Sequence, residues 1–187
     1  MRLAILALLA VLPLLNGCAP LLAGAAATGV LIAQDRRTVG TVTEDQGIEI
    51  RTVSRINERF KDATHINVTC FNRIVLLTGE VPSADAKAEV ERIARAVQNV
   101  RGVHNELAVA GVSSYTVRSN DTLLTSKVKA RFLDSQKFNG LHVKVVTENS
   151  VVYLLGMVNK QEANDATEIA RTTSGVQKVV RAFEYLD

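Results

Sequence analysis

The residues of this sequence that could carry chemistry are few, and they lie far apart. The chain of 187 residues contains three histidines and two cysteines. The histidines, His65, His104 and His142, are widely separated. No phosphate-cradling glycine loop, Gly-x-Ser-x-Gly nucleophile turn or Cys/His cluster with metal-ligand spacing occurs. The sequence therefore predicts no catalytic residue, no metal site and no cofactor, and an enzyme is the least favoured class of function.

Cys18 stands where a lipid could be attached. Residues 1–17 carry one positive charge, at Arg2, and an apolar run over residues 3–15. This pattern is typical of a secretory signal peptide, and the run is shorter than the roughly 20 residues of a membrane span. The sequence Leu15-Asn16-Gly17-Cys18 resembles a bacterial lipobox. That resemblance implies cleavage before Cys18, a diacylglyceryl group on its thiol and an acyl chain on its new amino group. Ala19 after the cysteine points to the outer membrane. The alternative is a fortuitous cysteine at the end of a cleaved signal.

The second cysteine, Cys70, has a different setting. It lies in an alternating stretch, on the same side as Ile66 and Val68. Free cysteine packs as a small apolar side chain. We therefore expect a buried, inert thiol at this position and no disulfide with Cys18.

Residues 18–43 are predicted to be a lipidated tether. Within them, residues 19–33 are apolar but small, and they are too few to span a membrane. This segment either lies near the bilayer or is a poorly packed linker. The polar residues that follow place a domain boundary near residue 44.

From residue 44 onward, the same pattern occurs twice. Asn72–Val81 aligns with Asn149–Val158, and both segments end in Gly-x-Val. Ile93-Ala94-Arg95 aligns with Ile169-Ala170-Arg171, in the same order along the chain. The sequence therefore predicts two tandem domains, at residues 44–110 and 111–187.

Each repeat is predicted to fold as αββαβ. A helix comes first, with Asp45 as N-cap in the first copy and Asn120 or Asp121 in the second. Two strands joined by a short turn follow, then a second helix and a last strand. The fold class is α+β, with two helices packed on a three-stranded sheet in each half. The first-helix residues expected to face the core are Val53, Ile56 and Phe60 in one copy and Leu124, Val128 and Phe132 in the other.

The Gly-x-Val turns, the Ile-Ala-Arg helices and the Val-x-x-Val entries to the last strands resemble the BON-domain family. Two such units behind a lipobox, with Arg36–Gly40 before the first and Ser119–Thr122 opening the second, are similar to the dual BON-domain outer-membrane lipoproteins of the DolP type. The resemblance implies a lipoprotein at the outer membrane that faces the periplasm and gathers at the division site. It also implies that the first helix of the second BON domain contacts anionic phospholipids, with tryptophan usual where this sequence has Leu123.

The small positive charge of the chain is concentrated in its second half. The formal net charge is +3 and aromatic residues make up 4%, so neither charge nor stacking surface supports nucleic-acid binding. Residues 45–110 contain nine Lys and Arg against nine Asp and Glu, whereas residues 111–187 contain ten against eight. Much of the basic charge of the second half lies on the predicted helix Thr122–Leu133.

This helix carries a candidate lipid-binding surface. Leu123, Lys127 and Arg131 form a stripe at helical spacing beside the core-facing residues, with Lys129 further round the helix. An exposed leucine above cations suits a bilayer surface, because the alkyl group enters the acyl boundary while the cations meet lipid phosphates. The alternative is an ordinary solvated helix face.

The corresponding helix of the first copy differs. Alignment of Arg59-Phe60 with Arg131-Phe132 puts Arg51 at the position of Leu123. The same alignment puts Arg55 at the position of Lys127. The first helix is therefore expected to have cations without an apolar tip.

The sequence thus favours a lipid-anchored periplasmic binding protein at the outer membrane. Its second BON domain is expected to bind anionic phospholipids such as phosphatidylglycerol or cardiolipin. The expected role is support of outer-membrane integrity, linked to cell division. The alternative is a protein-interaction scaffold for outer-membrane assembly or cell-wall machinery, without direct lipid recognition.

Overall fold

The computed structural model describes residues 35–60 and 64–186. The chain divides into two compact units, Met1–Asp35 and Arg36–Asp187. The predicted signal peptide, Cys18 and the tether up to residue 34 lie outside the described residues. No helix in the described part of the chain is both long and apolar enough to cross a membrane.

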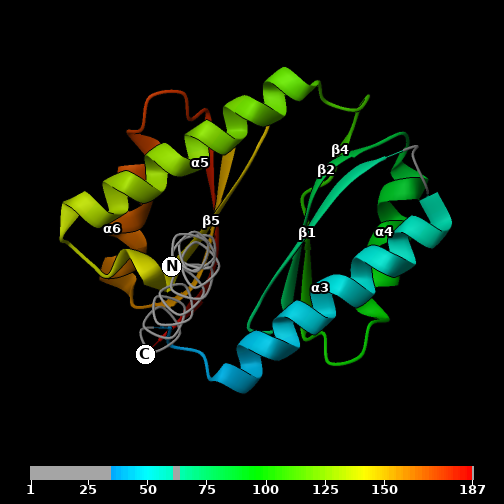
Figure 1. Ribbon diagram of the computed structural model, residues 1–187, viewed down its shortest axis with the longest axis horizontal. Helices are drawn as coiled ribbons and strands as arrows, with labels where there is room; N and C mark the ends of the chain where they lie inside the picture. Colours follow the sequence, from blue (N-terminus) through cyan, green and yellow to red (C-terminus); the bar gives the residue numbers. More distant parts are fainter. Residues whose placement is uncertain (1–34, 61–63, 187) are drawn as a thin grey trace, which may run out of the picture. The chain divides into compact units, whose positions relative to one another are not determined.

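The unit Arg36–Asp187 contains two copies of one arrangement (Figure 1). The order of elements confirms the predicted αββαβ pattern in each copy. The first repeat consists of α3 (Val39–Phe60), β1 (His65–Phe71), β2 (Ile74–Val81), α4 (Ala84–Arg95), β3 (Gly102–Asn105) and β4 (Ala108–Val109). The second repeat consists of α5 (Tyr115–Ser135), the 3-10 turn η3 (Gly140–His142), β5 (Val143–Glu148), β6 (Val151–Val158), α6 (Lys160–Arg171) and β7 (Lys178–Tyr185).

Both sheets have the same topology. The first two strands pair antiparallel, and the last strand pairs parallel to the second, in the orders β1-β2-β3 and β5-β6-β7. In the first repeat, the single last strand that the sequence predicted is broken, so that β4 also pairs with β2. Asn105 Oδ1 accepts a hydrogen bond from the amide of Leu107 at the break, and the Leu107 side chain is buried. The α+β class is confirmed, with four strands in the first sheet and three in the second.

Both first helices begin earlier than the sequence predicted. Thr38 Oγ1 accepts a hydrogen bond from the amide of Thr41 at the start of α3, and Ser114 caps α5. The predicted N-caps are therefore wrong: Asp45 and Asp121 lie inside the helices and are buried. The domain boundary expected at residue 44 falls inside α3.

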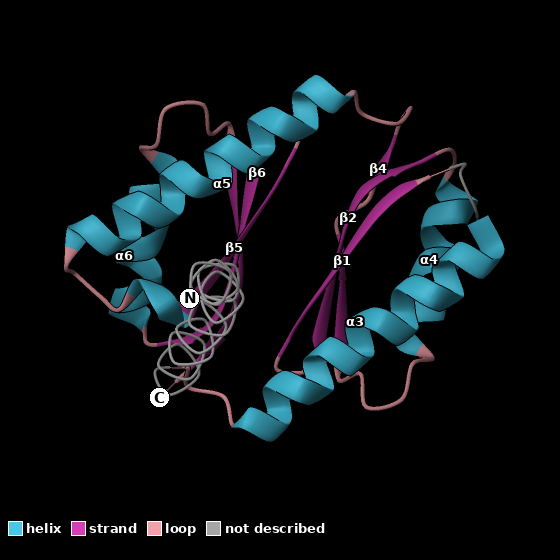
Figure 2. Ribbon diagram, in the orientation of Figure 1, coloured by secondary structure: helices cyan, strands magenta, loops and turns pink. Residues whose placement is uncertain are grey.

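Each pair of helices covers one face of its own sheet (Figure 2). The apolar face of α3 differs from the prediction at one position, because Val53 is 38% exposed and Thr52 is fully buried in its place. Thr52 can occupy the core because its hydroxyl donates to the Ile48 carbonyl one turn earlier. The predicted core positions Leu124, Val128 and Phe132 of α5 are confirmed.

The faces of the two sheets that the helices leave open pack against each other. Phe71 and Leu76 of the first repeat form a buried cluster with Tyr153 and Leu155 of the second. Figure 1 shows the two sheets between the helix pair α3 and α4 and the pair α5 and α6. The unit Arg36–Asp187 therefore holds all the apolar clusters of the described residues, and it has the core that it needs to fold without residues 1–34.

Two glycines explain the repeated Gly-x-Val motif. A Cβ atom on Gly79 would lie 2.0 Å from the carbonyl oxygen of His65, and one on Gly156 would lie 2.4 Å from that of His142. Gly79 also has a φ of 111°, which L side chains rarely adopt. Only glycine lets the first strand of each repeat approach the second this closely.

Candidate functional site

Helix α5 exposes apolar side chains on its outer face as well as burying them on its inner face. Leu124, Val128 and Phe132 pack into the second-repeat core. Tyr115 is 83% exposed, Leu123 60% and Leu133 62%. A solvated helix face normally carries polar residues. The outer face of α5 is therefore suited to contact an apolar phase or a partner.

Two lysines flank this outer face. Lys127 lies about 40° around the helix from Leu123, and Lys129 about 120° away on the other side. Both side chains are exposed, and among the described residues neither makes a hydrogen bond or an ion pair. Their ammonium groups are therefore available to an external anion.

Arg131, the third predicted cation, has partners within the protein. Its Nη1 donates to the Ile169 carbonyl and to Thr173 Oγ1, both at 2.8 Å. Its Nη2 donates to Thr172 Oγ1 at 3.1 Å. The guanidinium thus donates to acceptors at the C-terminal end of α6. Its positive charge also interacts favourably with the negative end of the helix dipole. Arg131 fixes α5 against α6 and adds positive charge on the Lys127 side.

A hollow of about 250 Å³ lies directly beside Leu123 and Lys127. Asn120 of α5 also lines it. The β5–β6 turn contributes Ser150, and the loop after α6 contributes Ser174 and Gly175. Apart from the leucines of α5, its walls offer hydroxyl, amide and ammonium groups. The hollow is therefore suited to a small polar anionic group such as a phosphate with its hydroxylated substituent.

The structure also corrects the alignment of the two first helices. The buried residues of α3 are Asp45, Ile48, Thr52 and Ile56, and those of α5 are Asp121, Leu124, Val128 and Phe132. Arg55 Nη1 donates to the carbonyl of Ala96 at the end of α4, just as Arg131 caps α6. The correct register is therefore one helical turn away from the predicted one. It places Gly47 at the position of Leu123, and Arg51 at that of Lys127. Helix α3 therefore has no side chain at the position of Leu123, although it exposes Ile50, at 70%, elsewhere on its surface.

Asp45 and Asp121 hold the turns between the first two strands. Asp45 accepts hydrogen bonds from the amides of Asn72 and Arg73, and Asp121 accepts from those of Asn149 and Ser150, at 2.7–2.9 Å. All four turn residues have positive φ, from 48° to 64°. This geometry is costly for residues other than glycine. The two buried carboxylates therefore stabilise a strained turn in each repeat.

Cys70 is buried, as predicted, and its thiol donates to Asp45 Oδ1 at 3.3 Å. Burial is the main cause that raises the pKa of the Cys70 thiol, and the nearby Asp45 carboxylate adds to the effect. The thiol is therefore held in its unreactive form.

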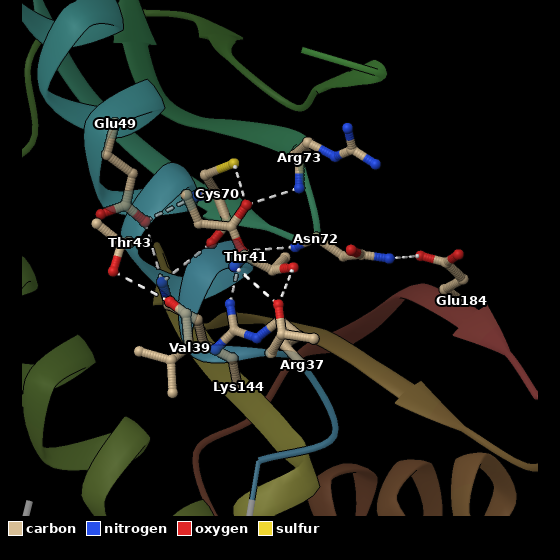
Figure 3. A network of polar contacts seen from close by, with 12 residues as sticks. Arg37, Val39, Thr41, Thr43, Glu49, Cys70, Asn72, Arg73, Lys144 and Glu184 are labelled. Atoms are coloured by element: carbon tan, nitrogen blue, oxygen red, sulfur yellow. Dashed lines mark hydrogen bonds and ion pairs between the residues drawn. The ribbon is translucent and has the colours of Figure 1, made fainter. Parts of the chain in front are cut away.

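Polar contacts join the two repeats around the apolar cluster between their sheets. Asn72 donates to Glu184, and Lys144 donates to Glu49 and to the Cys70 carbonyl (Figure 3). Asn67 donates to Glu148 Oε2 at 2.7 Å, and burial raises the pKa of Glu148. These contacts fix the second repeat on the first.

Two consecutive arginines before α3 bind different repeats. Arg36 donates to both oxygens of Glu162 at 2.7 Å and to the Met157 carbonyl, all in the second repeat. Arg37 pairs with Asp45 in the first repeat, also at 2.7 Å. The hydrogen bonds of Arg36, aided by the backbone amide of Asn159, lower the pKa of Glu162 from 4.5 to about 2.

The fold is thus that of a tandem αββαβ protein, in which each repeat has its own core. A family model for the BON domain matches residues 45–111 and 120–187. The chain belongs to the BON-domain family, as a two-domain member of the DolP type.

Three curated relatives cover most of the chain. The outer membrane lipoprotein DolP of Haemophilus influenzae is 36% identical over 92% of this chain and 91% of its own length. A 21 kDa hemolysin of Actinobacillus pleuropneumoniae is 30% identical, over 81% of this chain and 79% of its own. The osmotically-inducible protein Y of Escherichia coli K12 is also 30% identical, over 81% and 77% respectively.

Sequence reasoning placed Leu123, Lys127 and Lys129 on one exposed helix, but it missed the residues that come together only in three dimensions. The hollow beside Lys127 combines α5 with Ser150 and Ser174, which no sequence spacing connects. His65, Glu80 and Glu148 also come together, from three strands of two repeats. A signal did exist for the two aspartates, because Asp45 and Asp121 each precede a strand-turn asparagine by nearly the same number of residues.

Proposed function

We propose that this protein is an outer-membrane lipoprotein, anchored through acylated Cys18, whose helix α5 binds anionic phospholipids on the periplasmic side. Phosphatidylglycerol and cardiolipin are the proposed ligands. The observation that carries the proposal is the outer face of α5, where exposed Leu123 lies beside a polar hollow and between two lysines that have no ion pair within residues 35–60 and 64–186. The relatives named as outer-membrane and osmotically inducible proteins support the envelope location.

The chemistry assigns a separate part to each residue. Leu123 enters the boundary between headgroups and acyl chains, where each buried CH₂ contributes about 0.8 kcal/mol. Lys127 and Lys129 meet lipid phosphates on either side of it, and Arg131 adds positive potential from its position against α6. Asn120, Ser150 and Ser174 offer hydrogen bonds to the hydroxyl groups of a glycerol headgroup in the hollow.

The binding free energy expected from this contact is too small for the main membrane anchor. It fits a second interaction that selects the lipid. A basic residue near an anionic surface contributes about 1 kcal/mol. Two lysines therefore strengthen binding by roughly 30-fold. Stable residence at the membrane then depends on the acyl chains at Cys18. Their presence is tested by metabolic labelling with palmitate, which Cys18→Ala must abolish.

The residues of α5 are tested by co-sedimentation of residues 35–187 with phosphatidylglycerol vesicles. The variant Leu123→Ala/Lys127→Glu is expected to bind at least about tenfold more weakly than wild type, because it loses the apolar tip and reverses one charge. Lys160→Glu is the charge-matched control, since Lys160 is exposed at the opposite end of α6 from Ser174. The control is expected to bind like wild type.

Equal binding of wild type and the double variant would rule out this surface. Failure of wild type to bind the vesicles, combined with co-purification of a specific envelope protein, would favour the scaffold function instead. The comparison requires that the double variant is folded, as judged by its circular dichroism spectrum. We expect this because both substituted residues are exposed.

A further inference from the structure

One cluster of buried donor atoms has no part in the proposed lipid contact. His65 begins β1, Glu80 lies near the end of β2, and Glu148 ends β5. His65 Nδ1 is 3.1 Å from Glu80 Oε2 and 3.8 Å from Glu148 Oε1. The side chains are 17%, 5% and 8% exposed respectively. We propose that these three residues bind one zinc ion, which joins the first repeat to the second.

The spacing of the donor atoms fits the coordination sphere of this metal. Zinc binds histidine nitrogen and carboxylate oxygen at about 2.0–2.2 Å in a tetrahedral arrangement. Neighbouring ligand atoms of such a tetrahedron are about 3.3–3.6 Å apart. The two distances from His65 Nδ1 lie on either side of this range. All three ligand atoms lie within 4.8 Å of one another, so small side-chain shifts would suffice to place a metal ion between them.

Neighbouring groups orient both carboxylates. Asn67 Nδ2 donates to Glu148 Oε2 at 2.7 Å, which leaves Oε1 directed at His65. The amide of Ser113 donates to Glu80 Oε2 at 3.1 Å. Hydrogen bonds of this kind fix ligating carboxylates in metal sites. The carboxylates of Glu80 and Glu148 are therefore already oriented in the absence of a metal ion.

An independent observation at Thr78 also points to a missing ligand. Thr78 is fully buried, and its hydroxyl has no hydrogen-bond partner in the described part of the chain. It lies on the same face of β2 as Glu80, and its partner in the neighbouring strand β1 is Asn67. Its side chain therefore points into the same space between the sheets. Buried hydroxyls rarely lack a partner.

The cluster also has a route for an ion to enter. A cavity of about 380 Å³ is lined by His65, Asn67 and Glu148 together with Arg118, Thr122 and Thr125 of α5. A zinc site with three protein ligands keeps one position open, and the cavity gives that position access to solvent. In the cluster, two buried carboxylates face one imidazole, while Arg118 and Asp121, which also line the cavity, have opposite formal charges. A divalent cation would therefore compensate both negative charges of the cluster.

The test uses the full chain, purified in detergent without a histidine tag and stripped with a chelator. Isothermal titration is expected to show one zinc ion bound per chain. At a zinc concentration a hundred times the Kd, the Tm is expected to rise by about 5–10 °C. Magnesium and calcium at the same concentration are expected to leave the Tm unchanged, because they prefer all-oxygen sites.

Two ligand variants and one control decide the location. Glu148→Gln and His65→Gln are each expected to weaken zinc binding at least tenfold and to abolish the Tm rise. His104→Gln, which removes an exposed histidine of β3, is expected to bind like wild type. After metal removal, circular dichroism compares each variant with wild type. If one ligand variant has a folding defect, the zinc affinity of the other tests the site. The proposal is overturned if wild type shows no saturable zinc binding, or if the folded variants bind zinc as tightly as wild type.

Discussion

At the scale of single residues, two glycines and two aspartates make close contacts with backbone atoms of the first hairpins. Gly79 leaves room for the carbonyl oxygen of His65 in β1, and Gly156 leaves room for that of His142 just before β5. Asp45 and Asp121 satisfy the amides of turns that have positive φ at both positions. These four residues stand at equivalent places in the two repeats, so each repeat has the same means of closing its first hairpin.

The glycines give a prediction about stability. Gly156→Ala is expected to destabilise the protein by about 1–3 kcal/mol, because the added methyl group overlaps the His142 carbonyl. Gly79→Ala is expected to cost more, since its φ of 111° adds strain. Gly102→Ala is the control, because a Cβ atom there meets nothing within 4 Å. Urea unfolding of residues 35–187 measures all three, and an equal loss in Gly102→Ala and Gly156→Ala would contradict this explanation.

At the scale of elements, helix α5 has two different functions. Its inner face and Arg131 attach it to the second-repeat core and to the end of α6. Its outer face presents Leu123 and Lys127 to the surroundings. Helix α3 attaches in the same way, through Arg55, but has Gly47 where α5 has the leucine. The two first helices therefore differ at this position of their outer faces.

This division predicts opposite effects for two cations four residues apart. Arg131→Gln is expected to lower the free energy of unfolding by about 1–2 kcal/mol, because the α6 carbonyl and both threonines lose their donor. Lys127→Gln is expected to change stability by less than about 0.5 kcal/mol and to weaken vesicle binding. Urea unfolding and co-sedimentation of both variants give the comparison. The assignment fails if Lys127→Gln is the less stable of the two.

The elements also show how far a sequence can be interpreted. The periodicity of α5 predicted its buried and exposed residues correctly, since a helix face follows from spacing alone. Asp45 was interpreted as an N-cap because aspartate is favoured at helix starts. The true cap, Thr38, lies seven residues earlier, and the aspartate bonds to a turn 27 residues away. The broken last strand of the first repeat and the contacts between sheets depend on tertiary packing, which local sequence patterns do not reveal.

At the scale of the whole molecule, Arg36 and Arg37 attach the chain before α3 to both repeats. Arg36 binds Glu162 in the second repeat, and Arg37 binds Asp45 in the first. The open faces of the two sheets bury their apolar residues against each other. The described end of the predicted tether therefore contacts both repeats.

The Arg36–Glu162 pair predicts a pH dependence. The folded pKa of Glu162, about 2, lies below its ordinary value of 4.5. The stability that it contributes is therefore fully present above pH 4.5 and is lost as the pH falls from 4.5 through 2. Arg36→Met is expected to cost about 1–3 kcal/mol at pH 7 and clearly less at pH 3. Urea unfolding at the two pH values measures this, and an equal cost at both would contradict it.

The proposed entry of Leu123 into an anionic bilayer can be followed by fluorescence with the variant Leu123→Trp. The chain contains no tryptophan, so Leu123→Trp creates a single fluorescent reporter. With phosphatidylglycerol vesicles, we expect a blue shift of its emission and quenching by brominated acyl chains. Tryptophan in place of Tyr185, which is 47% exposed on β7, is expected to show neither effect. Unchanged Leu123→Trp emission while the protein sediments with the vesicles would show that binding occurs elsewhere and that Leu123 does not enter the bilayer.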